Sequence, residues 1–183
     1  MISWLKTILS RTRPVSRTRG RPPILPEGAA EQRYAALADH WALAEPKFYT
    51  PAHDEDGITA LEMRYGIRLP PEFRAYLSIA APRHQFMDNE TISWWSVRDI
   101  KSLAEECASW EPGWGGDAVE AEQHGYLVFA DYLIWCWAWA ICCVEGPHYG
   151  RIAVIRGSPP DTFVADDLSA FIGMALHDDP RIH

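Results

Sequence analysis

Cysteine is scarce in this sequence, and its spacing excludes the common zinc sites. The 183 residues include only four cysteines, and no two of them form a CxxC pair. Structural zinc sites are usually built from closely spaced Cys and His ligands. Three of the four, Cys136, Cys142 and Cys143, lie in the most apolar stretch of the chain, and Cys107 precedes it. We therefore expect buried, unreactive thiols in a reducing cytoplasm, and no metal.

The motifs of the common catalytic classes are also missing. No two of the seven histidines stand at i, i+4, there is no HExxH sequence, and no glycine-rich phosphate loop occurs. A Cys-His-Asp set could be assembled on paper from Cys136, His148 and Asp131. However, Cys136 has apolar neighbours in the sequence, and burial among such side chains raises the pKa of a thiol. We expect no enzymatic activity.

Positive charge is lacking from most of the chain. Six of the 17 Lys and Arg residues lie in Met1–Arg21, which has no acidic residue, so Pro22–His183 carries 11 basic and 25 acidic residues, net −14. Such a domain repels nucleic acid and attracts basic partners. Residues 1–27 are predicted to be a basic, disordered tail with a proline-rich linker, and residues 28–183 a single domain. The tail could also contact a membrane surface as an amphipathic anchor.

No apolar run is long enough for a membrane helix. The longest, Tyr126–Val144, is interrupted by Asp131, and the charge-free remainder falls short of the roughly 20 residues that a spanning helix needs. Large and small residues alternate along its second half, which indicates a strand. We predict a strand at Gly125–Ala130 and a long central strand at Leu133–Val144. Truncating one buried tryptophan, Trp137→Ala, is expected to cost about 3–5 kcal/mol.

The remaining periodicities predict helices, then strands, then one helix. Apolar residues recur at helical spacing, and proline and glycine mark the ends. The order of elements favours an α+β fold: a central antiparallel sheet of about four to six strands with helices packed against it. The expected helices are Gly28–Glu45, two within Gly57–Ala80, Arg98–Ser109, and one that Asp166 or Asp167 caps; the other expected strands are Thr91–Val97, Arg151–Arg156 and Thr162–Val164.

A tryptophan-containing loop, Trp110–Asp117, is the best candidate for a partner-binding surface. Tryptophans ringed by charge are typical of binding hot spots. The same loop could instead pack its tryptophans onto the sheet, and the sequence does not separate the two. The candidate binding residues are Glu105, Glu106, Trp110, Glu111, Trp114, Asp117 and Glu120.

Three segments in register resemble one family. ALEMRYGIRLPPEFRAYLS (Ala60–Ser78) resembles the opening signature of the Smi/Knr cell-wall-assembly-regulator-like family of the SUKH superfamily. YLVFADY (Tyr126–Tyr132) resembles its "lvFad" strand, and FVADDLSAFIGMAL (Phe163–Leu176) its closing helix. The matches span about residues 57–176. The matched motif residues are Leu61, Glu62, Gly66, Leu69, Pro70, Phe73, Phe129, Asp131 and Phe171, with Glu62 expected to brace the helix–loop–helix junction.

The chain also departs from the family pattern. Ala80-Ala81-Pro82 replaces a frequent Asn-Gly, and LIWCWAWAI follows directly after Asp131-Tyr132. A divergent member is therefore indicated. The resemblance implies a SUKH-like α+β fold, no catalysis and no cofactor. It also implies a cytoplasmic immunity protein that binds and neutralises a cognate toxin, often a nuclease and therefore a basic domain. The alternative is a regulatory or scaffolding adaptor held at a membrane surface by Met1–Arg21.

Overall fold

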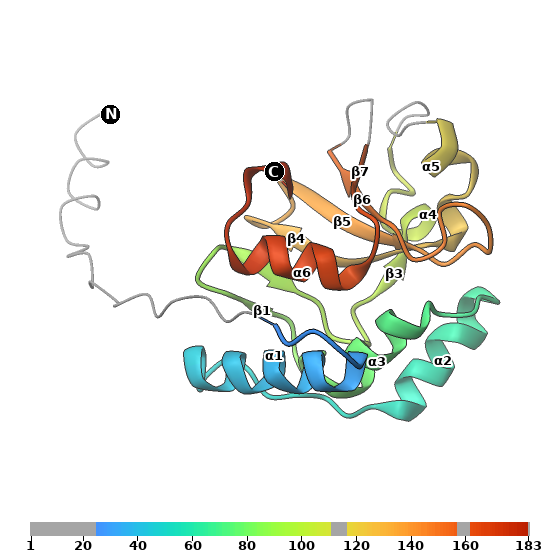
Figure 1. Cartoon of the computed structure of the whole chain (residues 1–183). Coiled ribbons are helices and arrows are strands. Elements are labelled where there is room, and N and C mark those ends of the chain that lie inside the picture. Colours follow the sequence, from blue (N-terminus) through green and yellow to red (C-terminus); the bar gives the residue numbers. More distant parts are fainter. Residues whose placement is uncertain (1–24, 111–116, 157–161, 183) are drawn as a thin grey trace, which may run out of the picture.

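One antiparallel sheet organises the protein. The computed structural model describes residues 25–110, 117–156 and 162–182. Within them seven strands form the sheet (Figure 1). Six of them pair in the order β1-β2-β4-β5-β6-β7. The seventh, β3, pairs with β4 on the same side of β4 as β2 does. The predicted α+β class with a central antiparallel sheet is confirmed, but the sheet has seven strands within the described residues rather than the predicted four to six. The strands are β1 (Phe86–Met87), β2 (Ile92–Trp94), β3 (Lys101–Ser102), β4 (Tyr126–Tyr132), β5 (Trp137–Cys142), β6 (Ile152–Ile155) and β7 (Thr162–Ala165).

The helices lie where proline, glycine and capping residues permit them. Gly66 ends the second helix at φ 62°, a left-handed conformation that glycine adopts without strain. Pro71 opens the next helix, and the Asp167 side chain caps the last one by accepting from the Ala170 nitrogen. The helices are α1 (Ala30–Ala44), α2 (Glu55–Tyr65), α3 (Pro71–Ile79), α4 (Leu103–Glu106), α5 (Asp117–Ala121) and α6 (Leu168–Leu176), with 3₁₀ turns at η1 (Gln123–Gly125) and η2 (Pro180–Ile182).

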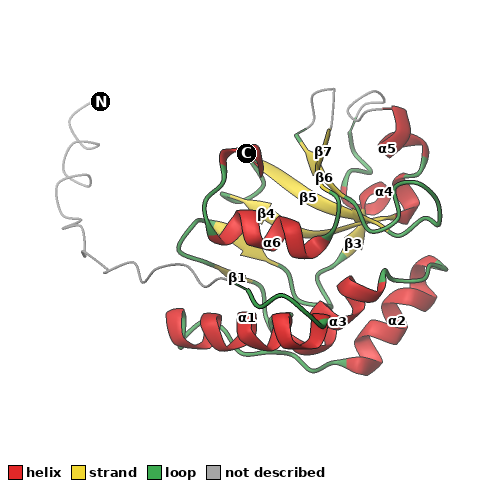
Figure 2. Cartoon of the chain, viewed as in Figure 1, coloured by secondary structure: helices red, strands yellow, loops and turns green. Residues whose placement is uncertain are grey.

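Large aromatic side chains fill the space between the sheet and α6. Strand pairing places Trp94, Ala130 and Trp139 opposite one another, so their side chains share one face of the sheet. Phe171 of α6 packs against this face, with its ring 6.2 Å from Trp94 and 5.2 Å from Trp139. Helices α1, α2 and α3 gather beside the same sheet (Figure 2), and Phe73 of α3 reaches the ring of Phe129, which is 5.7 Å away. The buried apolar residues form one cluster.

The alternation predicted for the second half of the apolar run is confirmed within β5. Trp137, Trp139 and Ile141 occupy every second position of β5 and therefore share one face of the sheet, where they pair with Tyr132, Ala130 and Leu127 of β4. The predicted length is wrong, however. The strand begins at Trp137 rather than Leu133, and Leu133–Cys136 form a turn. Asp131 and Tyr132, which fall between the two predicted strands, complete β4.

Two other sequence predictions need correction. The expected helix Arg98–Ser109 is a short strand, β3, followed by one turn of helix, α4, because the Ser102 side chain caps a helix that starts only at Leu103. Cys136 is exposed rather than buried, since it lies in the turn and not in a strand. Cys107, Cys142 and Cys143 are buried as expected, and burial raises the pKa of the Cys142 and Cys143 thiols.

Candidate functional site

The turn between β4 and β5 exposes apolar side chains on a strained backbone. We call Leu133–Cys136 the β4–β5 tip. Leu133, Ile134 and Trp135 have φ angles of 46°, 58° and 69°, in the left-handed region that residues other than glycine rarely adopt. Ile134 is 87% exposed and Leu133 is 44% exposed. Strain of this kind costs about 1–3 kcal/mol per residue and concentrates at functional sites.

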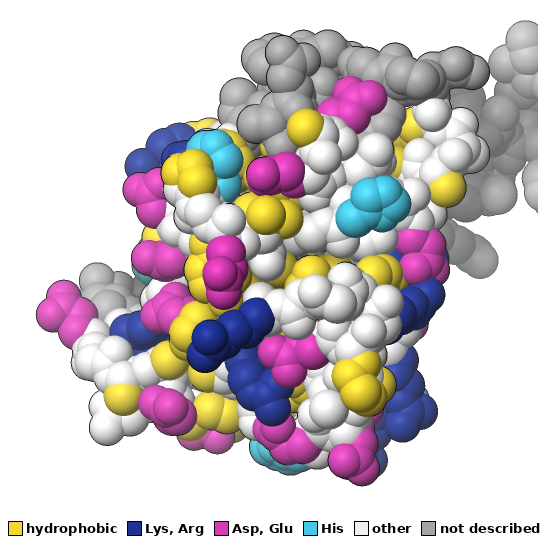
Figure 3. Space-filling model, turned by 90° about the vertical axis from the view of Figure 1, so that its right-hand side faces the viewer, with side chains coloured by type: hydrophobic (Ala, Val, Ile, Leu, Met, Phe, Trp, Pro, Cys, Tyr) yellow, Lys and Arg dark blue, Asp and Glu magenta, His cyan; other side chains and the backbone are white. Residues whose placement is uncertain are grey.

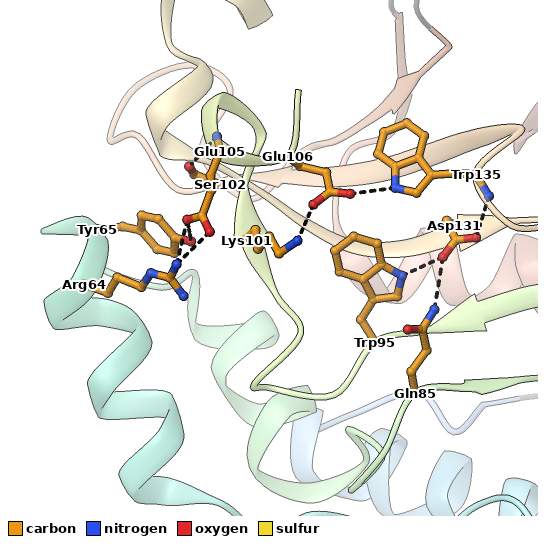
Figure 4. A network of polar contacts seen from close by, with 10 residues as sticks. All are labelled: Arg64, Tyr65, Gln85, Trp95, Lys101, Ser102, Glu105, Glu106, Asp131 and Trp135. Atoms are coloured by element: carbon orange, nitrogen blue, oxygen red, sulfur yellow. Dashed lines mark hydrogen bonds and ion pairs between the residues drawn. The ribbon is translucent and has the colours of Figure 1, made fainter. Parts of the chain in front are cut away.

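A buried carboxylate holds the tip in place. Asp131 is only 3% exposed, and its Oδ1 accepts a hydrogen bond from the backbone nitrogen of Trp135 at 3.0 Å. Its Oδ2 accepts from the indole nitrogen of Trp95 at 2.6 Å and from Gln85 Nε2 at 3.3 Å (Figure 4). A buried carboxylate must be compensated by such hydrogen bonds. Asp131 therefore links the tip to Gln85, directly before β1, and to Trp95, directly after β2.

A second carboxylate fixes the side chain of Trp135. Glu106 Oε1 accepts from the Trp135 indole nitrogen at 3.0 Å, and its Oε2 meets Lys101 Nζ at 2.8 Å. The hydrogen bond to Glu106 raises the pKa of the Lys101 ammonium, which favours the charged pair. Trp110 packs edge-on against Trp135 with ring centroids 5.6 Å apart. The tip is thus attached to α4 as well as to β4.

The neighbouring carboxylate, Glu105, faces α2 instead. Both of its oxygens lie 2.7 Å from Arg64 Nη2, and Tyr65 donates its hydroxyl to Oε2 at 2.8 Å (Figure 4). Burial is the main cause of the raised pKa of Tyr65, and the adjacent Glu105 adds to it. Together, Glu105 and Glu106 connect the helical layer to the hairpin through α4.

The structure brings together three of the seven predicted binding residues. Glu105, Glu106 and Trp110 meet around α4, where they contact other residues of the same chain. Glu111 and Trp114 lie outside the described residues, Asp117 begins α5, and Glu120 is half-buried on that helix. Of these residues, Glu106 and Trp110 contact Trp135 of the tip, whereas Glu105 contacts α2.

Three of the matched motif residues show their structural role most directly. Glu62 Oε1 accepts from the Leu69 nitrogen at 3.1 Å, and Oε2 meets Arg74 Nη1 at 2.9 Å, so the expected brace between α2 and α3 is confirmed. Asp131 has the tip contacts described above. Gly66 caps α2, and the other matched motif residues are buried. The buried residues are Leu61, Leu69, Pro70, Phe73, Phe129 and Phe171.

The residues considered for catalysis, Cys136, His148 and Asp131, each contact different residues. Cys136 Sγ contacts the carbonyl of Leu133 in the tip, and His148 stacks on Phe163 with ring centroids 4.6 Å apart.

Among residues 25–110, 117–156 and 162–182, no group of three or more His, Cys, Asp and Glu side chains is placed to hold a metal ion. In the same ranges no helix has both the length and the apolarity to cross a membrane. Met1–Arg21 lies outside them.

The turn between β1 and β2 lies next to the tip. The backbone nitrogen of Leu133 donates to the carbonyl of Thr91 at 3.2 Å, and Thr91 is itself left-handed at φ 67°. Asp88 holds this second turn by accepting from the Ile92 and Glu90 nitrogens and from the Trp94 indole. Burial raises the pKa of Asp88 to about 6. Strained backbone therefore gathers at one end of the sheet.

Sequence reasoning missed Leu133, Ile134, Trp95 and Gln85 as parts of this site. The turn contains no glycine, proline or asparagine, so the usual hairpin signals are absent. The signal that could have located the turn is the single charge, Asp131, followed by aromatic residues that close the hairpin. Tyr132 and Trp137 pair across the strands with stacked rings 4.2 Å apart.

The surface on the side of α2, α4 and α5 carries charges of both signs. In Figure 3 one group of Lys and Arg side chains lies near the middle of this face and others lie at its edges, with Asp and Glu side chains among them. The net charge of −14 over Pro22–His183 is therefore not concentrated in one acidic patch on this side.

The chain was also compared with known proteins. No family model matches it, and no curated protein matches it.

Proposed function

We propose that this protein is a non-enzymatic protein-binding module and that the β4–β5 tip is part of its binding surface. One observation carries the proposal: Ile134, the most exposed large apolar side chain of the described residues, sits on left-handed backbone that buried Asp131 holds in place. Strain persists only where the surroundings fix it. A tip fixed before binding loses less entropy on association, which favours a recognition role.

The favoured partner is a basic toxin domain, and the favoured role is that of a cytoplasmic immunity protein. The resemblance of Ala60–Ser78 and two later segments to the Smi/Knr-like family supports this role, as does the net charge of −14 over Pro22–His183. A nuclease must hold phosphate, so its active face tends to be basic. An acidic partner is steered towards such a face at low salt. A stable complex should bury about 1,200–2,000 Å² in total.

A protection assay tests this role. Each reading frame that flanks the gene is expressed in cells with and without the protein, and one that is toxic on its own serves for the assay. We expect survival only when the protein is present, and loss of survival with Ile134→Asp. Leu43→Asp is the matched control, because Leu43 is also exposed but lies on regular helix α1. Failure of the native protein to protect would overturn the immunity role.

A further inference from the structure

Strand β7 lies at one edge of the sheet. It is the last strand in the pairing order, and β6 is its neighbour. Within residues 25–110, 117–156 and 162–182, no backbone hydrogen bond joins β7 to any element other than β6. The N–H and C=O groups of an edge strand that point away from its neighbour are left to pair with another strand. The outer side of β7 can therefore accept one.

β7 has few of the features that usually block an exposed edge. Proteins protect such edges with very short strands, lysine, proline or bulges. The strand at the opposite edge, β1, has only two residues, whereas β7 has four, and its sequence TFVA contains no charge and no proline. Its one such feature is a bulge opposite Ile152 and Ala153, which adds Val164 to the strand. A bulge changes the direction of a side chain, and Val164 lines a hollow beside β7.

This hollow, of about 670 Å³, lies between β7 and α6. Ala170, Gly173 and Met174 line it from α6. A Cβ atom added at Gly173 would lie in open space, so small residues of α6 keep this side of the hollow wide. A strand added to β7 would lie beside the hollow, and every second side chain of that strand would point to the face of the sheet on which α6 lies.

The two sides of β7 differ in chemistry. Phe163 pairs with Ala153, which pairs with Ala140, so Phe163 lies on the face of the sheet opposite to α6. Its half-buried ring lies 4.6 Å from the ring of His148 and 4.3 Å from Arg151 Cζ. This side therefore suits an apolar residue of an added strand.

The side with the hollow is acidic. Asp166, Asp167 and Asp179 line it, and the exposed Asp166 lies 3.1 Å from Arg151, in a surface ion pair that contributes little. Arg181 also lines the hollow, but Asp179 accepts from its Nε at 2.9 Å and from its Nη2 at 2.6 Å. A basic side chain of an added strand is therefore favoured here.

We propose that β7 accepts an extended segment of a basic partner protein as a further strand of the sheet, with lysine or arginine side chains over the hollow and apolar side chains beside Phe163. In this mode of recognition, main-chain hydrogen bonds give affinity and alternate side chains give specificity. A second copy of the chain is disfavoured, because residues 22–183 carry a net charge of −14 and two copies repel each other. The inference rests on the proposed function only in taking the partner to be a basic protein.

Titration with short peptides tests the edge without a toxin. The probe is a blocked peptide of about eight residues in which valine and lysine alternate. Its controls are the valine–glutamate counterpart and the same valine–lysine peptide methylated on every backbone nitrogen. Each is added to the full chain at low ionic strength, and the amide signals of Phe163, Val164 and Ala165 are followed by NMR. We expect saturable shifts with the probe and binding at least about tenfold weaker with either control, because methylation removes main-chain hydrogen bonds and glutamate reverses the charge.

Substitutions locate the binding. Asp166→Asn should weaken binding of the valine–lysine peptide by about two- to fivefold, as expected for one exposed charge. Asp39→Asn removes the same charge from the exposed side of α1 and should leave the affinity unchanged. Equal unfolding temperatures would show that both variants fold. No saturable shift at β7, equal binding of the methylated peptide, or equal effects of the two substitutions would overturn the proposal.

The tip and the edge can be tested apart. Ile134→Asp should bind the valine–lysine peptide as the native protein does, because Ile134 lies in the β4–β5 tip and not on β7. Failure of the peptide to bind, with cells still protected from the toxin, would overturn the role of β7 alone. Peptide binding without protection would overturn the immunity role and leave the role of β7 in place.

Discussion

Asp131 accepts a hydrogen bond from the backbone nitrogen of Trp135 at 3.0 Å, across a turn that contains three consecutive left-handed residues. The same carboxylate also holds the Trp95 indole. One buried side chain thus fixes both the backbone of the β4–β5 tip and the segment that follows β2. The strained, exposed Ile134 depends on this arrangement.

Asp131→Asn is expected to lower the free energy of unfolding by about 1–3 kcal/mol. An amide can accept hydrogen bonds through only one of its two terminal atoms, so it leaves either the Trp135 nitrogen or the Trp95 indole without its acceptor. Urea denaturation measures the loss. Asp39→Asn, on the exposed side of α1, should change stability by less than about 0.5 kcal/mol. Equal effects of the two substitutions would show that Asp131 does not hold the tip.

Ile134→Gly is expected to raise the free energy of unfolding by about 1 kcal/mol. Glycine adopts the left-handed conformation without steric cost, and this relief exceeds the entropy that glycine adds to the unfolded chain. Leu43 is comparably exposed but lies within α1, where glycine is unfavourable. Leu43→Gly should therefore lower the free energy of unfolding by about 1 kcal/mol. Two changes of the same sign would argue against strain at Ile134.

Trp139 is the tryptophan of β5 whose truncation should cost most. It is fully buried, its ring packs on Phe171, and its indole donates to the Ile182 carbonyl at 3.0 Å. Trp139→Ala should cost about 3–5 kcal/mol in chemical denaturation. Trp137 is only half-buried and stacks on Tyr132, so Trp137→Ala should cost less than the 3–5 kcal/mol that the sequence predicted, about 1–2 kcal/mol. The reverse order would contradict this packing.

Asp88 should make the protein less stable as pH rises from about 4 to about 6. Burial raises the pKa of its carboxyl to about 6 in the folded protein, from 3.8 when unperturbed. The folded state therefore binds the proton more tightly than the unfolded state does. The stability linked to Asp88 is fully present below pH 4 and is lost as pH rises through 6, by on the order of 2–3 kcal/mol.

Asp88→Asn isolates this contribution, because asparagine does not titrate. The difference in the free energy of unfolding between the native protein and the variant, measured from pH 4 to pH 7, should fall with increasing pH and then level off. The variant also loses an acceptor for a backbone nitrogen or for the Trp94 indole, but this offset is the same at every pH. A difference that does not vary with pH would contradict the raised pKa of Asp88.

The sequence was sufficient to predict the fold class but not the length of every element. Gly66, Pro70-Pro71 and Asp167 mark helix ends by local chemistry, and the structure places helix ends at these residues. Alternation in Trp137–Cys142 predicted a strand because side chains on a strand point to opposite faces. The strands β1 and β3 have two residues each, which is too short for a periodic signal.

The tip could not be predicted because its conformation depends on distant residues. Leu133-Ile134-Trp135 has the composition of a strand, and local preference alone would extend β5 through it. The left-handed turn requires Asp131, Trp95 and Glu106, which no sequence spacing brings together. For the same reason, Glu105 and Glu106 resembled a binding surface in the sequence, whereas their carboxylates contact Arg64, Tyr65, Lys101 and Trp135.

Calorimetric titration with the purified C-terminal domain of a flanking gene's product that is toxic to cells tests the central claim most directly. We predict a one-to-one complex that Ile134→Asp weakens at least about tenfold, as expected for an anchor residue, and that Leu43→Asp leaves unchanged. Ile134→Asp must unfold at the temperature of the native protein or above it for this comparison. Absence of binding, or equal affinity of the native protein and Ile134→Asp, would contradict the claim that the β4–β5 tip recognises a protein partner.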